Sequence, residues 1–168
     1  MMAGNFSVMA ASPDDLDAVA RFLKSCGALP SRQSWMQIFL STVGSAADGG
    51  QLGRNEARIV VDRNGAIRAF CILHRLSHAV HHELLDIPVL TVECGPNKDE
   101  ISRLLFDHLV NRARESGCDT LRFWRSDASA WERWQRAGEE ERGDIGMIVP
   151  LPSKTTSTVS ISHTADTA

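Results

Sequence analysis

The chain has 168 residues, of which 43% are hydrophobic and 23% charged, and its formal net charge is −3. This length and balance predict one globular domain with its own core. They argue against a nucleic-acid binder, which normally carries a basic excess clustered on one face. No apolar run approaches the ~20 residues that cross a bilayer, and the first residues lack the basic and apolar regions of a secretory signal. We therefore expect a cytoplasmic protein with no nucleic-acid or membrane partner.

Cysteine spacing supports the same compartment. Cys26, Cys71, Cys94 and Cys118 are far apart and form no C-x-x-C pair, so neither a zinc site nor a redox pair is indicated. Reduced thiols fit a cytoplasmic protein.

A change in composition marks the end of the domain. Residues 153–168 are rich in Ser and Thr and nearly free of large apolar side chains. Such a segment cannot bury enough surface to offset its ordering entropy. We expect a folded domain over residues 1–152 and a disordered tail over 153–168.

The first part of the chain predicts a strand followed by two helices. Residues 6–11 are a short apolar segment typical of a strand. Helical periodicity, with a serine that can cap and a glycine that ends the first helix, predicts helices over 12–27 and 31–43. The glycines of residues 44–55 predict a loop.

The clearest β signal lies in the middle of the chain. Two apolar runs over residues 57–76 flank Asn64-Gly65, and Asn-Gly is the strongest short hairpin signal. A further strand is predicted over 84–94, where Pro88 indicates either a sheet edge or a bulge.

The rest of the domain predicts a crossover. A helix over 97–115 is followed by a strand over 119–125, a helix over 128–140 and a closing β pair that turns at Gly143-Asp144. A strand–helix–strand crossover is right-handed and makes its two strands parallel. The pattern predicts the α/β class, an α+β mixed central sheet with helices on both faces.

This order of elements over about residues 6–150 resembles the GNAT superfamily of N-acyltransferases. In that family the strand after the crossover helix leads into Asn-x-x-Ala-x-x-x-Tyr-x-Lys-x-Gly-Phe. The Asn, Ala, Tyr, Lys and Gly of the pattern fall here on Asp127, Ala130, Trp134, Arg136 and Gly138. The resemblance implies the GNAT-like acyl-CoA N-acyltransferase fold, with acetyl-CoA or another acyl-CoA as co-substrate.

The family's phosphate-binding loop, Gln/Arg-x-x-Gly-x-Gly/Ala, has no glycines at the matching place in this chain. Its glycine positions fall on Asn97, Asp99 or Ile101. Asn97 and Glu100 resemble a capping box, and acidic residues suit the positive end of a helix on their own. The residues that the resemblance implies for cofactor binding are Val92, Cys94, Asn97, Lys98, Asp99, Glu100, Ile101, Ser102, Arg103, Asp127 and Ala130.

The candidate catalytic residues are Glu93 and Trp134. Trp134 holds the place of the family's acidic tyrosine, yet an indole N–H is only a hydrogen-bond donor, so Trp134 is expected to form a wall of the cleft. Glu93 follows an apolar strand, and it is either the base or a solvent-facing carboxylate. Cys94 is a thiol acid, a nucleophile or an inert thiol, and Asp127 is a second carboxylate or a helix cap.

The histidines form a second group of candidates. Their spacing would suit metal ligands on one helix face, but residues 77–83 are predicted to connect two strands. We expect no metal site there and an exposed polar loop, with acceptor recognition or a proton relay near Glu93 as its other roles. The histidines concerned are His74, His78, His81 and His82.

Two functions remain open from the sequence. One is a divergent N-acetyltransferase that moves an acyl group from acyl-CoA to the amine of a small molecule or protein. The other is a catalytically inactive module with the same fold that binds a ligand or regulates a partner, favoured by the missing tyrosine and loop glycines. A sheet edge left open by the closing β pair would allow a homodimer.

Overall fold

The computed structural model describes residues 5–28, 31–44, 55–80, 82–124 and 146–151. Its elements are β1 (Phe6–Ala10), the short 3-10 helix η1 (Pro13–Asp15), α1 (Leu16–Ser25), α2 (Arg32–Gly44), β2 (Asn55–Asp62), β3 (Ile67–His78), β4 (His82–Val92), α3 (Lys98–Glu115), β5 (Thr120–Trp124) and β6 (Gly146–Pro150). The predicted order is confirmed for these ranges. The predicted helix over 128–140 and tail over 153–168 lie outside the described residues.

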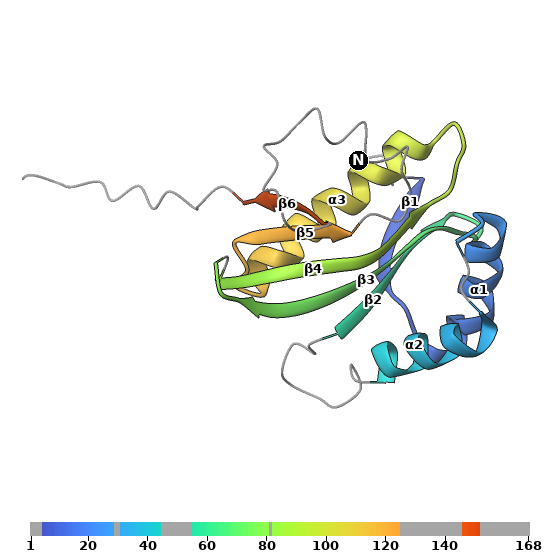
Figure 1. Ribbon diagram of the computed structural model, residues 1–168. Helices are drawn as coiled ribbons and strands as arrows, with labels where there is room; N and C mark the ends of the chain where they lie inside the picture. The colour runs from blue at the N-terminus through green and yellow to red at the C-terminus, as the bar shows by residue number, and fades with distance from the viewer. Residues whose placement is uncertain (1–4, 29–30, 45–54, 81, 125–145, 152–168) are drawn as a thin grey trace, which may run out of the picture.

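The strands form one mixed sheet in the order β1-β2-β3-β4-β5-β6. β4 and β5 are parallel, as the crossover through α3 requires, and the other neighbours are antiparallel. α1 and α2 lie against one face of the sheet and α3 lies against the other (Figure 1). The predicted mixed sheet with helices on both faces is therefore confirmed.

Each face carries its own core. On one face the rings of Trp35 and Phe39 from α2 meet Phe70 of β3, with ring centroids 5.1 to 6.2 Å apart. On the other face α3 buries a stripe at helical spacing against alternate residues of the strands. That stripe consists of Ile101, Leu105, Leu109 and Ala113.

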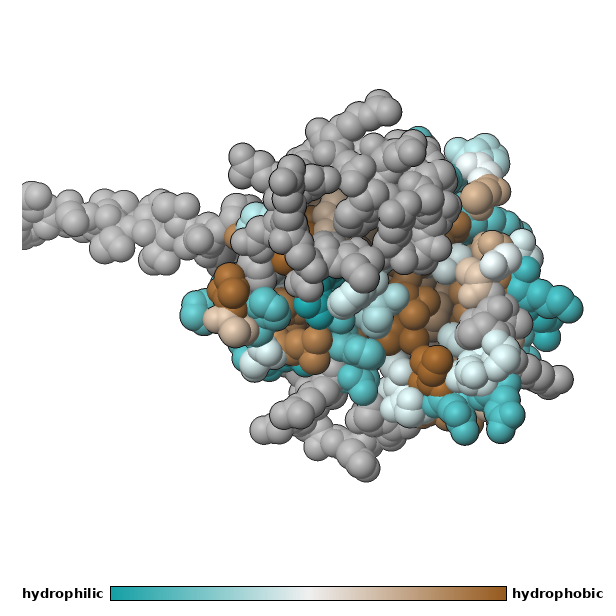
Figure 2. Space-filling view, in the orientation of Figure 1, coloured by the Kyte–Doolittle hydropathy of each residue, from teal (hydrophilic) through white to brown (hydrophobic). Residues whose placement is uncertain are grey.

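The apolar faces of α1 and α2 differ in detail from the sequence pattern. Phe22 of α1 is buried, whereas the apolar Ile38 of α2 is 44% exposed. Because α2 carries apolar residues on several sides, its periodicity alone could not place its buried face. Met36 and Leu40 also stay on the surface. On the face drawn in Figure 2, hydrophobic and hydrophilic side chains are intermixed.

The β2–β3 turn forms at the predicted Asn-Gly. Gly65 adopts a φ of 78°, a conformation that costs little only for glycine. The Asp62 carboxylate stabilises the turn because its Oδ1 accepts the backbone N–H groups of Asn64 and Ala66, at 2.8 and 3.0 Å.

Pro88 lies at a bulge in the middle of the sheet. The pairing of β3 with β4 shifts between His74↔Asp86 and Ile72↔Val89, so β4 holds one extra residue there. The predicted bulge is confirmed. The alternative of a sheet edge is wrong, because β4 lies between β3 and β5.

Within the described part of the chain, none of the helices is both long enough and apolar enough to cross a membrane.

Candidate active site

The two parallel strands at the centre of the sheet pair over only part of their length. Residues 84–87 of β4 pair with residues 120–123 of β5, and among the described residues no β5 partner exists for β4 beyond Ile87. The bulge at Pro88 comes directly after this last pair. The second half of β4 therefore keeps β3 on one side but has no described strand on its β5 side.

The direction of the β4 backbone in this segment follows from its pairing. The Glu93 N–H donates to the Arg68 carbonyl at 2.9 Å, so this pair exchanges ladder hydrogen bonds with β3. Because donors alternate along an antiparallel strand, the N–H of Val92 points to the β5 side. A carbonyl group placed there could accept it, as an oxyanion or thioester oxygen would.

A buried group of polar residues spans the last paired positions of the central strands. We call His74, Asp86, Arg122 and Trp124 the central polar cluster. His74 pairs with Asp86, and Asp86 pairs with Arg122, so three strands contribute to one row. Asp86 Oδ1 accepts hydrogen bonds from Arg122 Nε and Trp124 Nε1, both at 2.7 Å. The Arg122 guanidinium also lies 4.8 Å from the centre of the Trp124 ring.

The charges of this cluster are removed from water. Asp86 is 4% exposed and Arg122 is 8% exposed. A buried ion pair is tolerated when its hydrogen bonds are satisfied, and here one oxygen of Asp86 meets two donors. Its other oxygen, Oδ2, accepts no hydrogen bond from a described residue.

His74 is the titratable group of the cluster that burial keeps neutral. Burial lowers the pKa of His74 below its ordinary value of 6.5, and the nearby Asp86 carboxylate opposes this change. Its imidazole makes no hydrogen bond with any described residue. A neutral, half-buried imidazole beside a fixed carboxylate can accept a proton.

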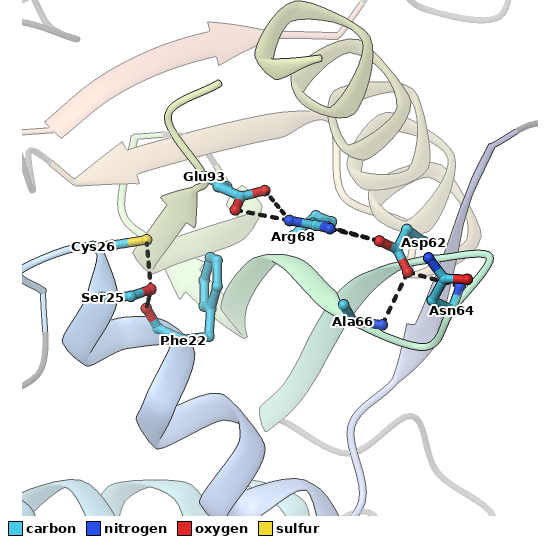
Figure 3. Close-up of polar contacts among 8 residues, drawn as sticks. All are labelled: Phe22, Ser25, Cys26, Asp62, Asn64, Ala66, Arg68 and Glu93. Carbon is cyan, nitrogen blue, oxygen red and sulfur yellow. Dashed lines mark hydrogen bonds and ion pairs between the residues drawn. The ribbon is translucent and has the colours of Figure 1, made fainter. Parts of the chain in front are cut away.

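Glu93, the predicted base, belongs to a different and more exposed group. We call Asp62, Arg68 and Glu93 the terminal ion-pair cluster (Figure 3). Arg68 Nη1 donates to both oxygens of Glu93, at 2.8 and 2.7 Å, while its Nε and Nη2 donate to Asp62 Oδ2, at 3.0 and 2.7 Å. The hydrogen bond from Arg68 lowers the pKa of Asp62. Glu93 would have to leave Arg68 to accept a proton from a substrate, which weighs against it as a base.

Glu93 directly follows Val92, whose N–H points to the β5 side, so its position does not exclude it from that part of β4. The role of Glu93 as a base therefore stays a prediction, and its contacts favour a structural one.

The predicted cofactor-binding residues of the β4–α3 loop lie together. Cys94, Asn97, Lys98 and Ile101 line a hollow of about 430 Å³, whose other wall comes from the β2–β3 turn and the start of β1. This hollow is on the β1 side of the loop, away from β5. Ile101 is 2% exposed and packs in the core, so only its backbone is available to a ligand.

The N-terminus of α3 has fewer of its backbone N–H groups bonded than the sequence predicted. The expected capping box is wrong, because the Asn97 side chain makes no capping hydrogen bond to the helix. Lys98 and Ile101 donate their backbone N–H groups to Gly95 and Asn97, whereas those of Asp99 and Glu100 meet no described acceptor. The predicted Asp99, Glu100 and Arg103 are exposed and Ser102 is half-buried. The N-terminus of α3 therefore keeps two backbone N–H groups without a described acceptor, and the carboxylates of Asp99 and Glu100 lie beside them.

The histidine segment has a different position from the one expected. His78 ends β3 and pairs with His82 at the start of β4, so these residues lie in two strands and not on a helix face. Because the full length of β4 separates His82 from Glu93, roughly 36 Å of strand lies between them. The expected proton relay to Glu93 is wrong. His74 alone of the described histidines joins the central strands' polar row.

The thiols fall into two groups. Cys71 and Cys118 are buried, and burial raises the pKa of Cys71 to about 12, which makes that thiol inert. Cys94 is exposed and lines the hollow. Cys26 follows the end of α1 and lies near Cys94. Burial raises the pKa of the Cys26 thiol, although the hydrogen bond with the Ser25 hydroxyl acts to lower it.

Three predicted site residues, Asp127, Ala130 and Trp134, lie outside the described residues, and their roles stay predictions. The central polar cluster was missed by the sequence analysis, although a signal was present. Asp86 interrupts the apolar run "LLDIPV" and Arg122 interrupts "TLRFW". Opposite charges inside two strands that a crossover makes neighbours indicate a buried pair.

This chain is similar to known proteins in its structure but not in its sequence. No protein-family model matches the sequence, and no curated protein is similar to it in sequence. A GNAT-family acetyltransferase from Staphylococcus aureus Mu50 is 15% identical with a TM-score of 0.63, over 83% of this chain and 88% of that one. A ribosomal-protein-alanine N-acetyltransferase from Brucella melitensis biovar Abortus 2308 is 15% identical with a TM-score of 0.59, over 83% and 95%.

A third solved structure is a predicted acetyltransferase with acetyl-CoA from Clostridium acetobutylicum. It is 14% identical with a TM-score of 0.59, over 81% of this chain and 90% of that one. At these identities the likeness concerns the fold, and it agrees with the mixed sheet and the α3 crossover. The chain has the fold of the GNAT acetyltransferases.

Proposed function

We propose that this protein transfers an acyl group from acetyl-CoA or another acyl-CoA to the amine of a small molecule or a protein. The observation that carries the proposal is the second half of β4, which bulges at Pro88 and has no described β5 partner. A thioester lying along that side would receive the Val92 N–H on its carbonyl oxygen. Fold alone does not fix function, so the proposal depends on this geometry.

Acyl transfer from a thioester to an amine mainly requires the protein to hold the two reactants in position. An amine attacks the thioester carbonyl, the C–N bond forms, the C–S bond breaks, and the amine proton passes to a base. Holding the two reactants in line can supply several kcal/mol of the barrier reduction. The absence of tyrosine from the chain therefore does not prevent transfer.

The cofactor's phosphates would lie at the start of α3. The backbone N–H groups of Asp99 and Glu100 have no described acceptor, and Lys98 and Arg103 supply positive charge nearby. The carboxylates of Asp99 and Glu100 oppose an anion at the same place. We expect weaker binding than a glycine-rich loop would provide.

A ligand titration tests the proposal. Acetyl-CoA that binds only the folded chain raises its stability, by about 2.7 kcal/mol at a concentration one hundred times Kd. A thermal-shift series with acetyl-CoA should show this rise, and CoA release should follow when primary amines are added. No shift at millimolar acetyl-CoA would contradict the proposal.

A backbone variant makes the test specific to β4. Val92→Pro removes the N–H that points to the β5 side and leaves the Thr91 and Glu93 ladder bonds to β3 intact. We expect Val92→Pro to fold and to bind acetyl-CoA about tenfold more weakly, the loss of one good hydrogen bond. Thr91→Pro is the matched control, because it removes a β3 ladder bond and should reduce stability instead.

The second candidate function is a binding or regulatory module without catalysis. It is favoured by Asp99 and Glu100 at the helix end where phosphates would bind, and by the lack of any tyrosine. A thermal shift with acetyl-CoA but no CoA release over the amine panel would support this function over the first.

A further inference from the structure

We propose that Cys26 and Cys94 form a reversible disulfide that joins the end of α1 to the β4–α3 loop. Both thiols are free in this structure. The bond would form whether or not the protein transfers acyl groups, because it needs only the two thiols and an oxidant. Only its effect on acetyl-CoA binding rests on the proposed function.

The fold sorts the four thiols of the chain by exposure. Cys71 and Cys118 are buried in the core under α3, on the opposite face of the sheet from α1. Cys26 is half-buried and Cys94 is exposed. A thiol forms a disulfide only where an oxidant and a second sulfur can reach it. Cys26 and Cys94 are therefore the pair that a dissolved oxidant reaches.

Tertiary packing brings Cys26 to the end of β4. Its side chain packs against the core beneath α1 and α2, which includes Ile67 at the start of β3 and Val89 of β4. Figure 3 shows the Cys26 sulfur pointing from the end of α1 towards Glu93, the residue before Cys94. Negative charge on Cys94 or Glu93 opposes ionisation of the Cys26 thiol, so the three side chains lie within electrostatic range.

The β4–α3 loop leaves Cys94 room to meet Cys26. A disulfide holds two Cα atoms about 4.4–6.8 Å apart, so a backbone that can adjust lets the bond form without strain in the sheet. Residues 94–97 are exposed, and no atom from elsewhere lies within 4 Å of the place that a Gly95 Cβ would take. Cys26 follows the last residue of α1. Each cysteine thus lies just beyond the end of a regular element.

A metal ion is the other common use of thiols beside a carboxylate. A structural zinc ion takes four Cys or His ligands in a tetrahedron. Among the described residues, no three His, Cys, Asp or Glu side chains are placed to hold an ion, although Glu93 lies near both thiols. The Glu93 carboxylate is instead held by Arg68. Two thiols without further ligands favour oxidation over metal binding.

Hydrogen peroxide can supply the oxidation in two balanced steps. The Cys94 sulfur attacks the peroxide, so an S–O bond forms, the O–O bond breaks and hydroxide leaves to become water. The product is the sulfenic acid of Cys94. The Cys26 sulfur then attacks this sulfenic acid, the S–S bond forms, and hydroxide leaves with the Cys26 proton as a second water. The two sulfur atoms together lose the two electrons that the peroxide gains.

Burial decides which thiol reacts first. Burial raises the pKa of Cys26, so this thiol stays protonated until its partner has been oxidised. The Ser25 hydroxyl donates its hydrogen to the Phe22 carbonyl at 2.7 Å, so at 4.0 Å it can only accept from the Cys26 S–H. Cys94 is exposed at the hollow and meets the peroxide directly. Cys94 is therefore the first thiol to react, and Cys26 closes the bond.

Peptide mass spectrometry on the full chain tests the bond. The reduced protein is treated with hydrogen peroxide, its free thiols are blocked with iodoacetamide, and it is digested with trypsin. Each cysteine falls in a different tryptic peptide, so the partner of each sulfur is identified directly. We expect peptides 25–32 and 76–98 to be joined, and dithiothreitol to separate them. The peptides of Cys71 and Cys118 should stay unlinked.

Three variants assign the steps. Cys26→Ser should stop the reaction at the sulfenic acid of Cys94, which dimedone traps. Cys94→Ser should leave Cys26 as a free thiol under the same treatment. Cys118→Ala changes a buried thiol under α3 and should form the bond as wild type does. A link between any other two peptides, no link while Cys94 is oxidised, or a link found only in a covalent dimer overturns the inference.

The bond should also change the start of α3. Gly95, Pro96 and Asn97 alone separate Cys94 from the helix, so a shift of Cys94 towards α1 reaches the first turn. The backbone N–H groups proposed for the cofactor's phosphates lie in that turn. We expect the oxidised chain to bind acetyl-CoA about tenfold more weakly, the loss of one good hydrogen bond. Dithiothreitol should restore the affinity.

Titration of both forms with acetyl-CoA separates this effect from the bond itself. Linked peptides with an unchanged affinity would overturn the effect on binding and leave the disulfide in place. If neither form binds acetyl-CoA, the proposed function fails, while the linked peptides still establish the disulfide. If the reduced chain binds acetyl-CoA and no linked peptides form, the disulfide fails and the proposed function stands.

Discussion

The central polar cluster and the terminal ion-pair cluster set an arginine against carboxylates in opposite surroundings. Asp86 and Arg122 have side chains that are 6% and 10% exposed, whereas Arg68 and Glu93 are 33% and 39% exposed. Both pairs are 2.7 Å apart. The two ion pairs therefore differ in energy although their distances are equal. Desolvation strengthens the interaction of Asp86 with Arg122 and also raises the cost of removing one partner.

The two clusters also differ in what they connect. The terminal cluster ties the end of β4 to the β2–β3 turn through Asp62 and fixes the start of the β4–α3 loop. The central cluster joins β3, β4 and β5 at the position where the parallel pairing ends. The first supports the path of the chain, and the second lies at the last described pair between β4 and β5.

The largest expected effect is on the central cluster. Asp86→Ala leaves the Arg122 charge and the Trp124 N–H without their shared acceptor, so the free energy of unfolding should fall by about 3–5 kcal/mol. Urea denaturation followed by circular dichroism measures it. Asp86→Asn, which keeps an acceptor oxygen, should lose less. A loss below about 1 kcal/mol for Asp86→Ala would show that the pair is not desolvated.

The next effect is a loss of stability in weak acid. Burial lowers the pKa values of both His74 and His108, so the unfolded chain binds their protons at higher pH than the folded chain does. Stability should be complete above about pH 6.5 and fall below it, with a slope of at most about 1.4 kcal/mol per pH unit for each proton.

Melting curves between pH 8 and pH 5, run as about half-unit steps, test this slope and its assignment. His74→Gln should flatten part of the slope, and His74→Gln with His108→Gln should flatten most of it. Glu56 does not contribute to the slope between about pH 8 and pH 5. Burial acts to raise the pKa of Glu56, but hydrogen bonds from Arg112 and Arg58 lower it, so the stability that Glu56 contributes is lost only at more acidic pH. A slope that survives in the double variant would assign the effect to other groups.

The smallest expected effect is on the terminal cluster. Arg68→Ala removes two partly exposed ion pairs, so the free energy of unfolding should fall by only about 0.2–1 kcal/mol per pair. The loss should shrink in about 1 M salt, where the Debye length is ~3 Å. A salt-independent loss as large as that of Asp86→Ala would remove the distinction between the two clusters.

Local patterns predicted much of the fold. The Asn64-Gly65 turn and the helix predicted over 97–115 were each identified from neighbouring residues, and each is present. These features depend on backbone preferences and on periodicity within one element. For the same reason Pro88 was recognised as a bulge candidate, while its place inside the sheet was not.

The candidate site was predicted less well because it is assembled from distant segments. Glu93 was selected for its place at the end of a strand, and its partner Arg68 could not be foreseen from spacing. His74 was grouped with His78 and His82 by sequence distance, although it pairs with Asp86 in another strand.

The amino-acid sequence by itself determined the order and type of the described elements, because propensity, capping and periodicity act over a few residues. It also determined that β4 and β5 are parallel, since a helical crossover allows no other arrangement in one sheet. Only the tertiary structure decided which polar residues share an environment. The bulge at Pro88 and the pairing of three strands place His74, Asp86 and Arg122 in one buried row, where desolvation sets their charges.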